Sequence, residues 1–341
     1  EKIIDRYGFA DSALDISYFN IISIEPNAFE MCRSRSIRSL NLQCKKETFT
    51  SGCCTCHQPK RPAMIFSGAH LNLFEPLKEH LVELDLSNNL FDCSFNFLRN
   101  LKRLQKLTLH NCRYATEPVF KEADNQLTHL DMSGTEITNP DMFDDLKRLK
   151  HLNLRRCQLK RVLPALFKEL KQLDTLVLIE TYCYPAISEK KLLGLEHLKQ
   201  LTMRSTTVVN QVNLNLKSIE KLSLSCFFLS PKMFTAPSML RELTLHCSSR
   251  LMIDENFFDN HPNVESVSFS SFYNPEHESC MRDGKYPKGT CYIDLNAFTK
   301  LKSFKSLKLP NQNFNLDGDC PIFRLEQLET LDLSLSDRDK Y

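Results

Sequence analysis

The stretch Leu149-Lys150-His151-Leu152-Asn153-Leu154-Arg155-Arg156-Cys157 alternates leucines with polar residues and ends on a cysteine. Its core is a Leu-x-Leu triplet, and another leucine stands three residues before that triplet. The pattern occurs eight times at intervals of 21 to 25 residues, with Met in place of the second Leu in two copies and Ile219 in place of the preceding leucine in one. The eight triplets are Leu84-Asp85-Leu86, Leu107-Thr108-Leu109, Leu130-Asp131-Met132, Leu152-Asn153-Leu154, Leu176-Val177-Leu178, Leu201-Thr202-Met203, Leu222-Ser223-Leu224 and Leu243-Thr244-Leu245. A near-constant period of this size indicates a repeat architecture.

Five further copies carry the pattern over nearly the whole chain. They are Leu14-Asp15-Ile16, Leu40-Asn41-Leu42, Val267-Ser268-Phe269, Leu307-Lys308-Leu309 and Leu331-Asp332-Leu333. Each triplet predicts a short strand whose apolar side chains point inward. One unit is too small to bury that apolar face alone, so neighbouring units must stack into a solenoid.

The thirteen copies resemble the leucine-rich-repeat family. The resemblance implies an α/β repeat solenoid, a horseshoe with a parallel concave sheet and mostly irregular or 3₁₀ convex segments. It also implies an inward side chain three residues after the second leucine, which satisfies backbone groups of the neighbouring coil. That position holds Asn89, Cys112, Thr135, Cys157, Thr181, Thr206, Phe227 and Ser248.

Phenylalanines about thirteen residues after the second leucine refine the resemblance. They stand at or near Phe29, Phe120, Phe143, Phe167, Phe234, Phe257 and Phe298. A phenylalanine there fills the space between coils that other subfamilies fill with a full helix. The chain therefore resembles the extracellular type, as in Toll-like receptor ectodomains and related surface or secreted repeat proteins.

The composition excludes several classes of function. Lys and Arg number 44 and Asp and Glu 42, for a net charge of +2, which is far from the basic excess of a nucleic-acid-binding protein. No run approaches the roughly 18 apolar residues of a membrane span. Only 8 glycines argue against folds built on glycine-rich phosphate loops. We expect no nucleic-acid partner, no membrane span within this chain and no cofactor.

For domain organisation we expect a single solenoid over residues 1–341 with about thirteen repeats. Neither end shows a polar cap, so we expect a fragment of a longer protein. Two intervals are too long for one repeat, which predicts insertions near residues 44–72 and 273–292. Within the first insertion, Ala69-His70-Leu71-Asn72-Leu73 suggests an additional poor strand, and a cysteine-rich loop precedes it.

The cysteines bear on the cellular compartment. Cys280 and Cys291 lie together in the second insertion and are candidates for a disulfide. Disulfides are also favoured for the cluster Cys44, Cys53, Cys54 and Cys56, with Cys32 or Cys93 as outside partners; zinc is the alternative, although only half of a paired ligand set is present. None of the 23 asparagines lies in an Asn-x-Ser/Thr glycosylation motif. We still favour an extracellular or cell-surface location, with the cytoplasm as the alternative.

Three places are candidates for ligand binding, and each has a plainer interpretation. His110, His129 and His151 on consecutive coils, with Lys106 and Arg155, form a titratable basic strip or simply scattered solvated side chains. Val177 and Ile179, with Tyr182 and Tyr184 nearby, form an apolar anchor of the kind that protein partners use, or are covered by a loop. The insertion from Tyr273 to Tyr292, with Arg282 and Lys285, is a binding loop or a tolerated surface loop.

The sequence shows no nucleophile beside a base with a third orienting group, and we expect no enzyme and no metal site. The resemblance implies a recognition module that binds a protein or other macromolecular ligand, as part of a cell-surface or secreted receptor of innate-immune type. The alternatives are an intracellular leucine-rich-repeat adaptor or sensor and a structural matrix protein. The sequence leaves the oligomeric state open.

Overall fold

The computed structural model describes residues 12–19, 21, 23–44, 64–67, 70, 72–92, 95–114, 120, 126–160, 165–184, 194–204, 217–226, 239–247, 252–271, 291–309, 314–317 and 325–333. The chain divides into two compact units, the first formed by Glu1–Leu176, Thr181–Tyr184 and Leu193–Leu195, and the second by Val177–Glu180, Pro185–Leu192 and Glu196–Tyr341. No helix in the described ranges has the length and apolar character needed to cross a bilayer. One solenoid domain over the full length stays a prediction.

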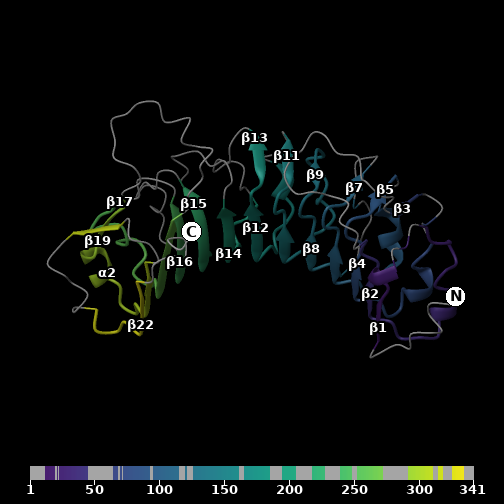
Figure 1. Cartoon of the computed structure of the whole chain (residues 1–341), viewed down its shortest axis with the longest axis horizontal. Helices are drawn as coiled ribbons and strands as arrows, with labels where there is room; N and C mark the ends of the chain where they lie inside the picture. Colours follow the sequence, from purple (N-terminus) through teal and green to yellow (C-terminus); the bar gives the residue numbers. More distant parts are fainter. Residues whose placement is uncertain are drawn as a thin grey trace, which may run out of the picture. The chain divides into compact units, whose positions relative to one another are not determined.

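The principal parallel sheet contains thirteen strands, and these coincide with the thirteen predicted triplets. In the first unit the order begins β1 (Ala13–Asp15), β2 (Ser39–Asn41), β4 (Glu83–Asp85), β6 (Lys106–Thr108), β8 (His129–Asp131) and β10 (His151–Asn153). Residues of β12 (Thr175–Ile179) belong to both units. In the second unit the order is β14 (Gln200–Arg204), β15 (Lys221–Cys226), β16 (Glu242–Cys247), β18 (Ser266–Ser271), β20 (Ser306–Lys308) and β22 (Thr330–Asp332). The predicted fold class, a parallel-sheet repeat solenoid with little helix, is confirmed (Figure 1).

The strands are held in register because leucine pairs with leucine on the inward face. Leu84 pairs with Leu107, and Leu107 pairs with Leu130, each at most 2% exposed. Side chains alternate across a strand, so the residues between the leucines lie on the opposite, solvent-facing side. A slip of one residue would expose every leucine, and this fixes the register strongly.

The predicted inward positions behave as the repeat pattern requires. Asn89 Nδ2 donates to Leu42 O at 3.0 Å and to Leu86 O at 2.9 Å. The other four described members are also buried and donate to carbonyls: Cys112 to Leu86 O at 3.2 Å, Thr135 to Met132 O at 2.6 Å, Cys157 to Met132 O at 3.1 Å and Thr181 to Leu154 O at 2.7 Å. Most of these carbonyls belong to the preceding coil, so the side chains link adjacent coils.

On the other side of the coils, the described residues form two- to four-residue strands and short helical turns. Three small sheets have the orders β3-β5-β7, β13-β11-β9 and β17-β19-β21. Their strands are β3 (Ile65–Phe66), β5 (Leu90–Phe91), β7 (Arg113–Tyr114), β9 (Glu136–Ile137), β11 (Gln158–Lys160), β13 (Tyr182–Tyr184), β17 (Met252–Ile253), β19 (Cys291–Asp294) and β21 (Phe314–Asp317). In Figure 1, β9 and β11 lie above principal strands of the same unit such as β8.

The described helical segments are short, which confirms the expected irregular and 3₁₀ character. They are η1 (Ser17–Phe19), η2 (Glu30–Cys32), η4 (Glu75–Leu77), η5 (Phe95–Asn100), η6 (Ala165–Phe167) and α2 (Asn296–Thr299). Most of the predicted phenylalanines fill the interior beside them, at 0–4% exposure: Phe29, Phe120, Phe143, Phe167, Phe257 and Phe298. Neighbouring rings pack on one another, as between Phe258 and Phe298, whose centroids are 5.5 Å apart.

The first insertion differs from the prediction in two respects. The segment near Ala69–Leu73 adds no strand to the principal sheet, because β2 pairs directly with β4. Its described residues form turns instead, and Leu73 is buried there. Cys44 is a free buried thiol and not part of a disulfide, and Cys32 is also free. Cys53, Cys54 and Cys56 lie outside the described residues.

Candidate functional site

Two rows of polar side chains cross the solvent face of the first unit. Glu83, Lys106, His129 and His151 occupy equivalent positions on β4, β6, β8 and β10, and so do Asp85, Thr108, Asp131 and Asn153. All eight are half-buried or exposed. The strand register aligns the residues of each row across the four strands. The rows form the sheet face, by which we mean the solvent side of β4 to β10.

The aspartates of the sheet face are fixed by their own coils. Asp85 Oδ1 accepts from the backbone N of Ser87 at 2.9 Å and from its Oγ at 2.5 Å. Asp131 makes the same two contacts with Ser133, at 2.8 Å and 2.5 Å. The arrangement recurs between Asp15 and Ser17. Such Asx turns hold the carboxylate against the backbone and end the strand.

Asp131 is the centre of a larger polar network. Its Oδ2 accepts from Asn153 Nδ2 at 2.8 Å, and Ser133 Oγ lies 2.7 Å from His110 Nδ1. Because Ser133 donates its only hydroxyl proton to Asp131, His110 must donate from Nδ1 to Ser133. The serine proton is therefore directed away from the histidine. This is a positioning network and not an activated nucleophile.

His129 and His151 stack across the gap between β8 and β10. Their ring centroids are 4.1 Å apart and the ring planes differ by 16°. Desolvation lowers the pKa of His129, and the nearby His151 and Lys106 lower it further. Thr128 Oγ1 donates to Gln105 O at 3.2 Å and lies 2.9 Å from His129 Nδ1, so His129 also donates from Nδ1.

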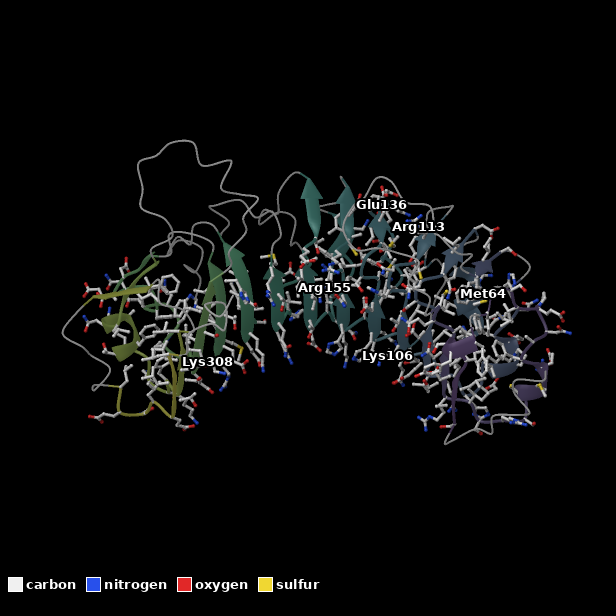
Figure 2. The ribbon with its side chains drawn as sticks, viewed as in Figure 1. Met64, Lys106, Arg113, Glu136, Arg155 and Lys308 are labelled. Atoms are coloured by element: carbon white, nitrogen blue, oxygen red, sulfur yellow. The ribbon has the colours of Figure 1, made fainter. Side chains whose placement is uncertain are left out.

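Cationic side chains flank this histidine pair. Lys150 precedes His151, and Arg155 follows Asn153 by two residues; both are exposed. Lys106 Nζ lies 4.0 Å from Glu83 Oε2, a weak exposed pair. Figure 2 shows Lys106 on the lower side of the first unit, and Arg113 and Glu136, from the small sheets, on its upper side. Of the predicted strip, Lys106, His129 and His151 therefore lie in one row, whereas His110 and Arg155 follow the ends of β6 and β10.

The other predicted places are not assembled in the same way. Val177 and Ile179 are half-buried on β12, between inward-facing leucines. Tyr182 and Tyr184 belong to β13, which pairs with β11 in a small sheet. Tyr273, Arg282, Lys285 and Cys280 lie outside the described residues. Cys291 begins β19, and its side chain is not described.

The second unit contains a serine–histidine contact on adjacent strands. Ser223 Oγ lies 3.3 Å from His246 Nε2. Partial burial, and secondarily Arg204, lower the pKa of His246 to about 4. A base with so low a pKa takes a proton poorly at neutral pH, so the contact does not favour nucleophilic catalysis. The described residues also contain no cluster of three or more potential metal-binding side chains.

Comparison with known proteins agrees with this geometry. The Leucine Rich Repeat family model matches residues 148–170. A chain of the Drosophila Toll–Spatzle complex superposes with a TM-score of 0.62, covering 92% of this chain and 45% of that chain at 10% identity. An internalin, InlF of Listeria monocytogenes, superposes with a TM-score of 0.50, covering 90% of this chain and 83% of that one at 12% identity. The chain has the leucine-rich-repeat fold.

One relative is similar in sequence over a limited stretch. The disease resistance protein RPS4B of Arabidopsis thaliana is 40% identical over 80 residues, which are 23% of this chain and 7% of that protein. The chain thus matches only a small part of that relative's length. At 10 and 12% identity, the two structural neighbours establish the fold alone. The leucine-rich-repeat fold is typical of protein-binding receptors, because stacked repeats create extended binding surfaces.

Sequence reasoning missed the partners that orient the leucine-rich-repeat sheet face. Ser87, Ser133 and Thr128 were not singled out, although the first two lie in the recurring pattern Leu-Asp-x-Ser. That pattern is a detectable signal, since a serine two residues after an aspartate favours an Asx turn. The Thr128 contact has no such signal, because it depends on the coil before it.

Two thiols of the leucine-rich-repeat interior are chemically inert. Burial raises the pKa of Cys157 to about 12 and raises that of Cys112 further. A thiol reacts as its thiolate, so neither group is a nucleophile in the folded protein. The prediction of these two cysteines as small buried side chains with weak donors is confirmed.

Proposed function

We propose that this chain is the recognition module of a cell-surface or secreted receptor of innate-immune type, and that it binds a protein ligand through the sheet face. The observation that carries the proposal is that polar side chains of the sheet face are held in place by residues of their own coils. The carboxylates of Asp85 and Asp131 are held by Ser87 and Ser133 of their own coils. A surface fixed before binding loses little conformational freedom when a partner docks.

The dimensions of the sheet face favour a macromolecular ligand. Neighbouring strands lie about 4.8 Å apart, so the rows from β4 to β10 extend over roughly 14 Å. The side chains of these rows are all half-buried or exposed, which makes them available for many shallow contacts. A small molecule is usually enclosed in a concave pocket, whereas a protein partner can cover such an array. The Toll–Spatzle complex, described as a hub of Drosophila development and innate immunity, supports a receptor role.

Selection of binding peptides from a random phage library tests the use of this face. Peptides selected on the unmodified chain should lose at least about tenfold in affinity for Thr108→Phe. They should bind Gln158→Phe normally. Both positions are half-buried polar residues on first-unit strands, but Gln158 lies on β11 of a small sheet. Equal losses in the two variants, or a loss only in Gln158→Phe, would remove the sheet face from the binding role.

An intracellular sensor is the second candidate function. Two observations favour it: the similarity to a plant disease resistance protein, and four buried free cysteines, Cys32, Cys44, Cys112 and Cys157. Cytosolic proteins keep their thiols reduced, whereas exported proteins of this cysteine content form disulfides. Thiol titration of the natural protein under denaturing conditions separates the candidates. Mostly blocked cysteines out of the 14 are expected for the receptor, and mostly reactive ones would favour the sensor.

A further inference from the structure

Three histidines lie on three consecutive coils, with His129 on β8, His151 on β10 and His110 just after the end of β6. We propose that the face over β6, β8 and β10 binds an acidic segment of a protein partner, and that acidification strengthens this binding. The inference rests on the proposed function, because it names the chemistry of the ligand at the same face. The inference depends on which charged side chains of the face already have partners within the protein.

The negative groups of this region are largely occupied within the protein. Both carboxylate oxygens of Asp131 accept hydrogen bonds, from Ser133 and Asn153. Asp85 is held by its Asx turn, and Glu83 faces Lys106. In contrast, no ion pair is found for Lys150 or Arg155 in the part of the chain that the structure describes. The carboxylates of Asp85 and Asp131 are thus held in place by neutral donors, and Lys150 and Arg155 are the cations left available to a ligand carboxylate.

Protonation of the histidines requires no rearrangement of their existing contacts. His110 and His129 both donate from Nδ1, to Ser133 and to Thr128 respectively. Each ring therefore keeps Nε2 as the nitrogen that accepts a proton. A proton taken up at Nε2 creates a second N–H donor and leaves the first hydrogen bond in place. Each imidazolium can then donate to a ligand carboxylate.

The stacked pair couples proton uptake to anion binding. Two imidazolium rings 4.1 Å apart repel each other, which opposes their joint protonation in the free protein. A carboxylate beside them offsets this repulsion and so favours proton uptake by the pair. By linkage, the ligand binds more tightly at a pH where the rings take up protons. The charged groups that influence His129 are Glu83, Lys106, Lys150 and His151; on the same face Asp85, Asp131 and Arg155 complete the set.

Peptide carboxylates fit the face better than a continuous polyanion. The net charge of the chain is only +2, and Glu83, Asp85 and Asp131 remain within the same rows. A phosphate backbone with uniformly spaced charge would pass close to these carboxylates and be repelled. An acidic segment of a protein can alternate carboxylates with neutral residues, so its charges meet only the cationic positions. We therefore take the ligand to be an acidic peptide segment.

The test uses the full chain and an Asp/Gly-rich fluorescent peptide, whose carboxylates stay ionised at both pH values compared. Anisotropy titrations at about pH 7.5 and about pH 5.5 should show binding at least about tenfold tighter at the lower pH, ~1.4 kcal/mol. His129→Gln with His151→Gln should remove most of this difference between the two pH values. Lys150→Gln with Arg155→Gln should weaken binding at both pH values.

Three controls make the result decisive. His197→Gln, at an exposed histidine of the second unit, should retain the full pH effect. A peptide with Asn in place of Asp should not bind, and single-stranded DNA of matched charge should bind less tightly than the Asp peptide. Tighter DNA binding, a pH effect that survives in the double histidine variant, or no pH effect at all would overturn the inference. If library-selected peptides still distinguish Thr108→Phe from Gln158→Phe, the proposed function stands even then.

Discussion

Leu307→Ala is expected to lower the free energy of unfolding of the second unit by about 2–5 kcal/mol. Leu307 is fully buried on β20, and its backbone pairs with Val267 on one side and Leu331 on the other. The cavity left by the substitution is walled by coils on both sides, so the surroundings cannot easily collapse into it. Urea titration followed by circular dichroism measures the change.

The neighbouring strand supplies a matched control. Leu331 occupies the same repeat position on β22 but is 40% exposed. Leu331→Ala should therefore cost about 1 kcal/mol or less, since a side chain already in contact with water leaves little cavity. Equal costs for the two variants would contradict stabilisation by stacking between neighbouring coils.

Asn89→Asp is expected to destabilise the first unit by about 3–5 kcal/mol at neutral pH. The amide of Asn89 is fully buried and donates to carbonyl oxygens of Leu42 and Leu86. A carboxylate at this position would be an uncompensated charge facing those carbonyls. Denaturant titration at neutral pH measures the loss.

The pH dependence of this variant separates charge from lost hydrogen bonds. Burial raises the pKa of such an aspartate, so the penalty is complete above the raised pKa and decreases as the pH falls below it. Asn89→Leu leaves the carbonyls unpaired without adding a charge and should cost about 1–3 kcal/mol at all pH values. A penalty for Asn89→Asp that does not change with pH would show that the carboxylate is solvated.

The principal sheet could be predicted because its signal is repeated and local. Leucines alternate with polar residues in each triplet, and the inward side chain always follows at the same spacing, as at Asn89 and Cys112. The small sheets could not be predicted in this way. Strands of two residues, such as Ile65–Phe66, contain no alternation to detect, and they exist because the coils before and after them are already stacked.

The strand expected near His70 does not form, and this difference has a physical explanation. Ala69-His70-Leu71-Asn72-Leu73 alternates apolar and polar residues as a strand does. His70 instead uses both ring nitrogens, with Nδ1 accepting from the Ser67 backbone at 3.0 Å and Nε2 lying 3.0 Å from Ile24 O. Contacts with a residue 46 positions earlier decide the conformation, and alternation alone does not reveal them.

The candidate site was predictable in composition but not in geometry. The histidines, Lys106 and Arg155 could be assigned to one face because each follows the repeat spacing. The stacking of His129 on His151 depends on side-chain rotamers, and the roles of Ser133 and Thr128 depend on hydrogen bonds across strands. These details determine where a proton can bind, which the spacing does not specify.

The Asx turns divide two tasks between neighbouring residues of each repeat. The aspartate that ends a strand is satisfied by a serine of its own coil, whereas the inward side chain three residues after the second leucine most often reaches the preceding coil. The conformation of each strand end is thus fixed by contacts within its own coil. The attachment of one coil to the next depends on the inward side chains. A duplicated coil would bring its own strand ending and meet the same carbonyls on its neighbour. Deletion of a coil would leave two coils that can form the same contacts with each other. The length of the sheet face can therefore change during evolution in whole coils, without redesign of the coils that remain.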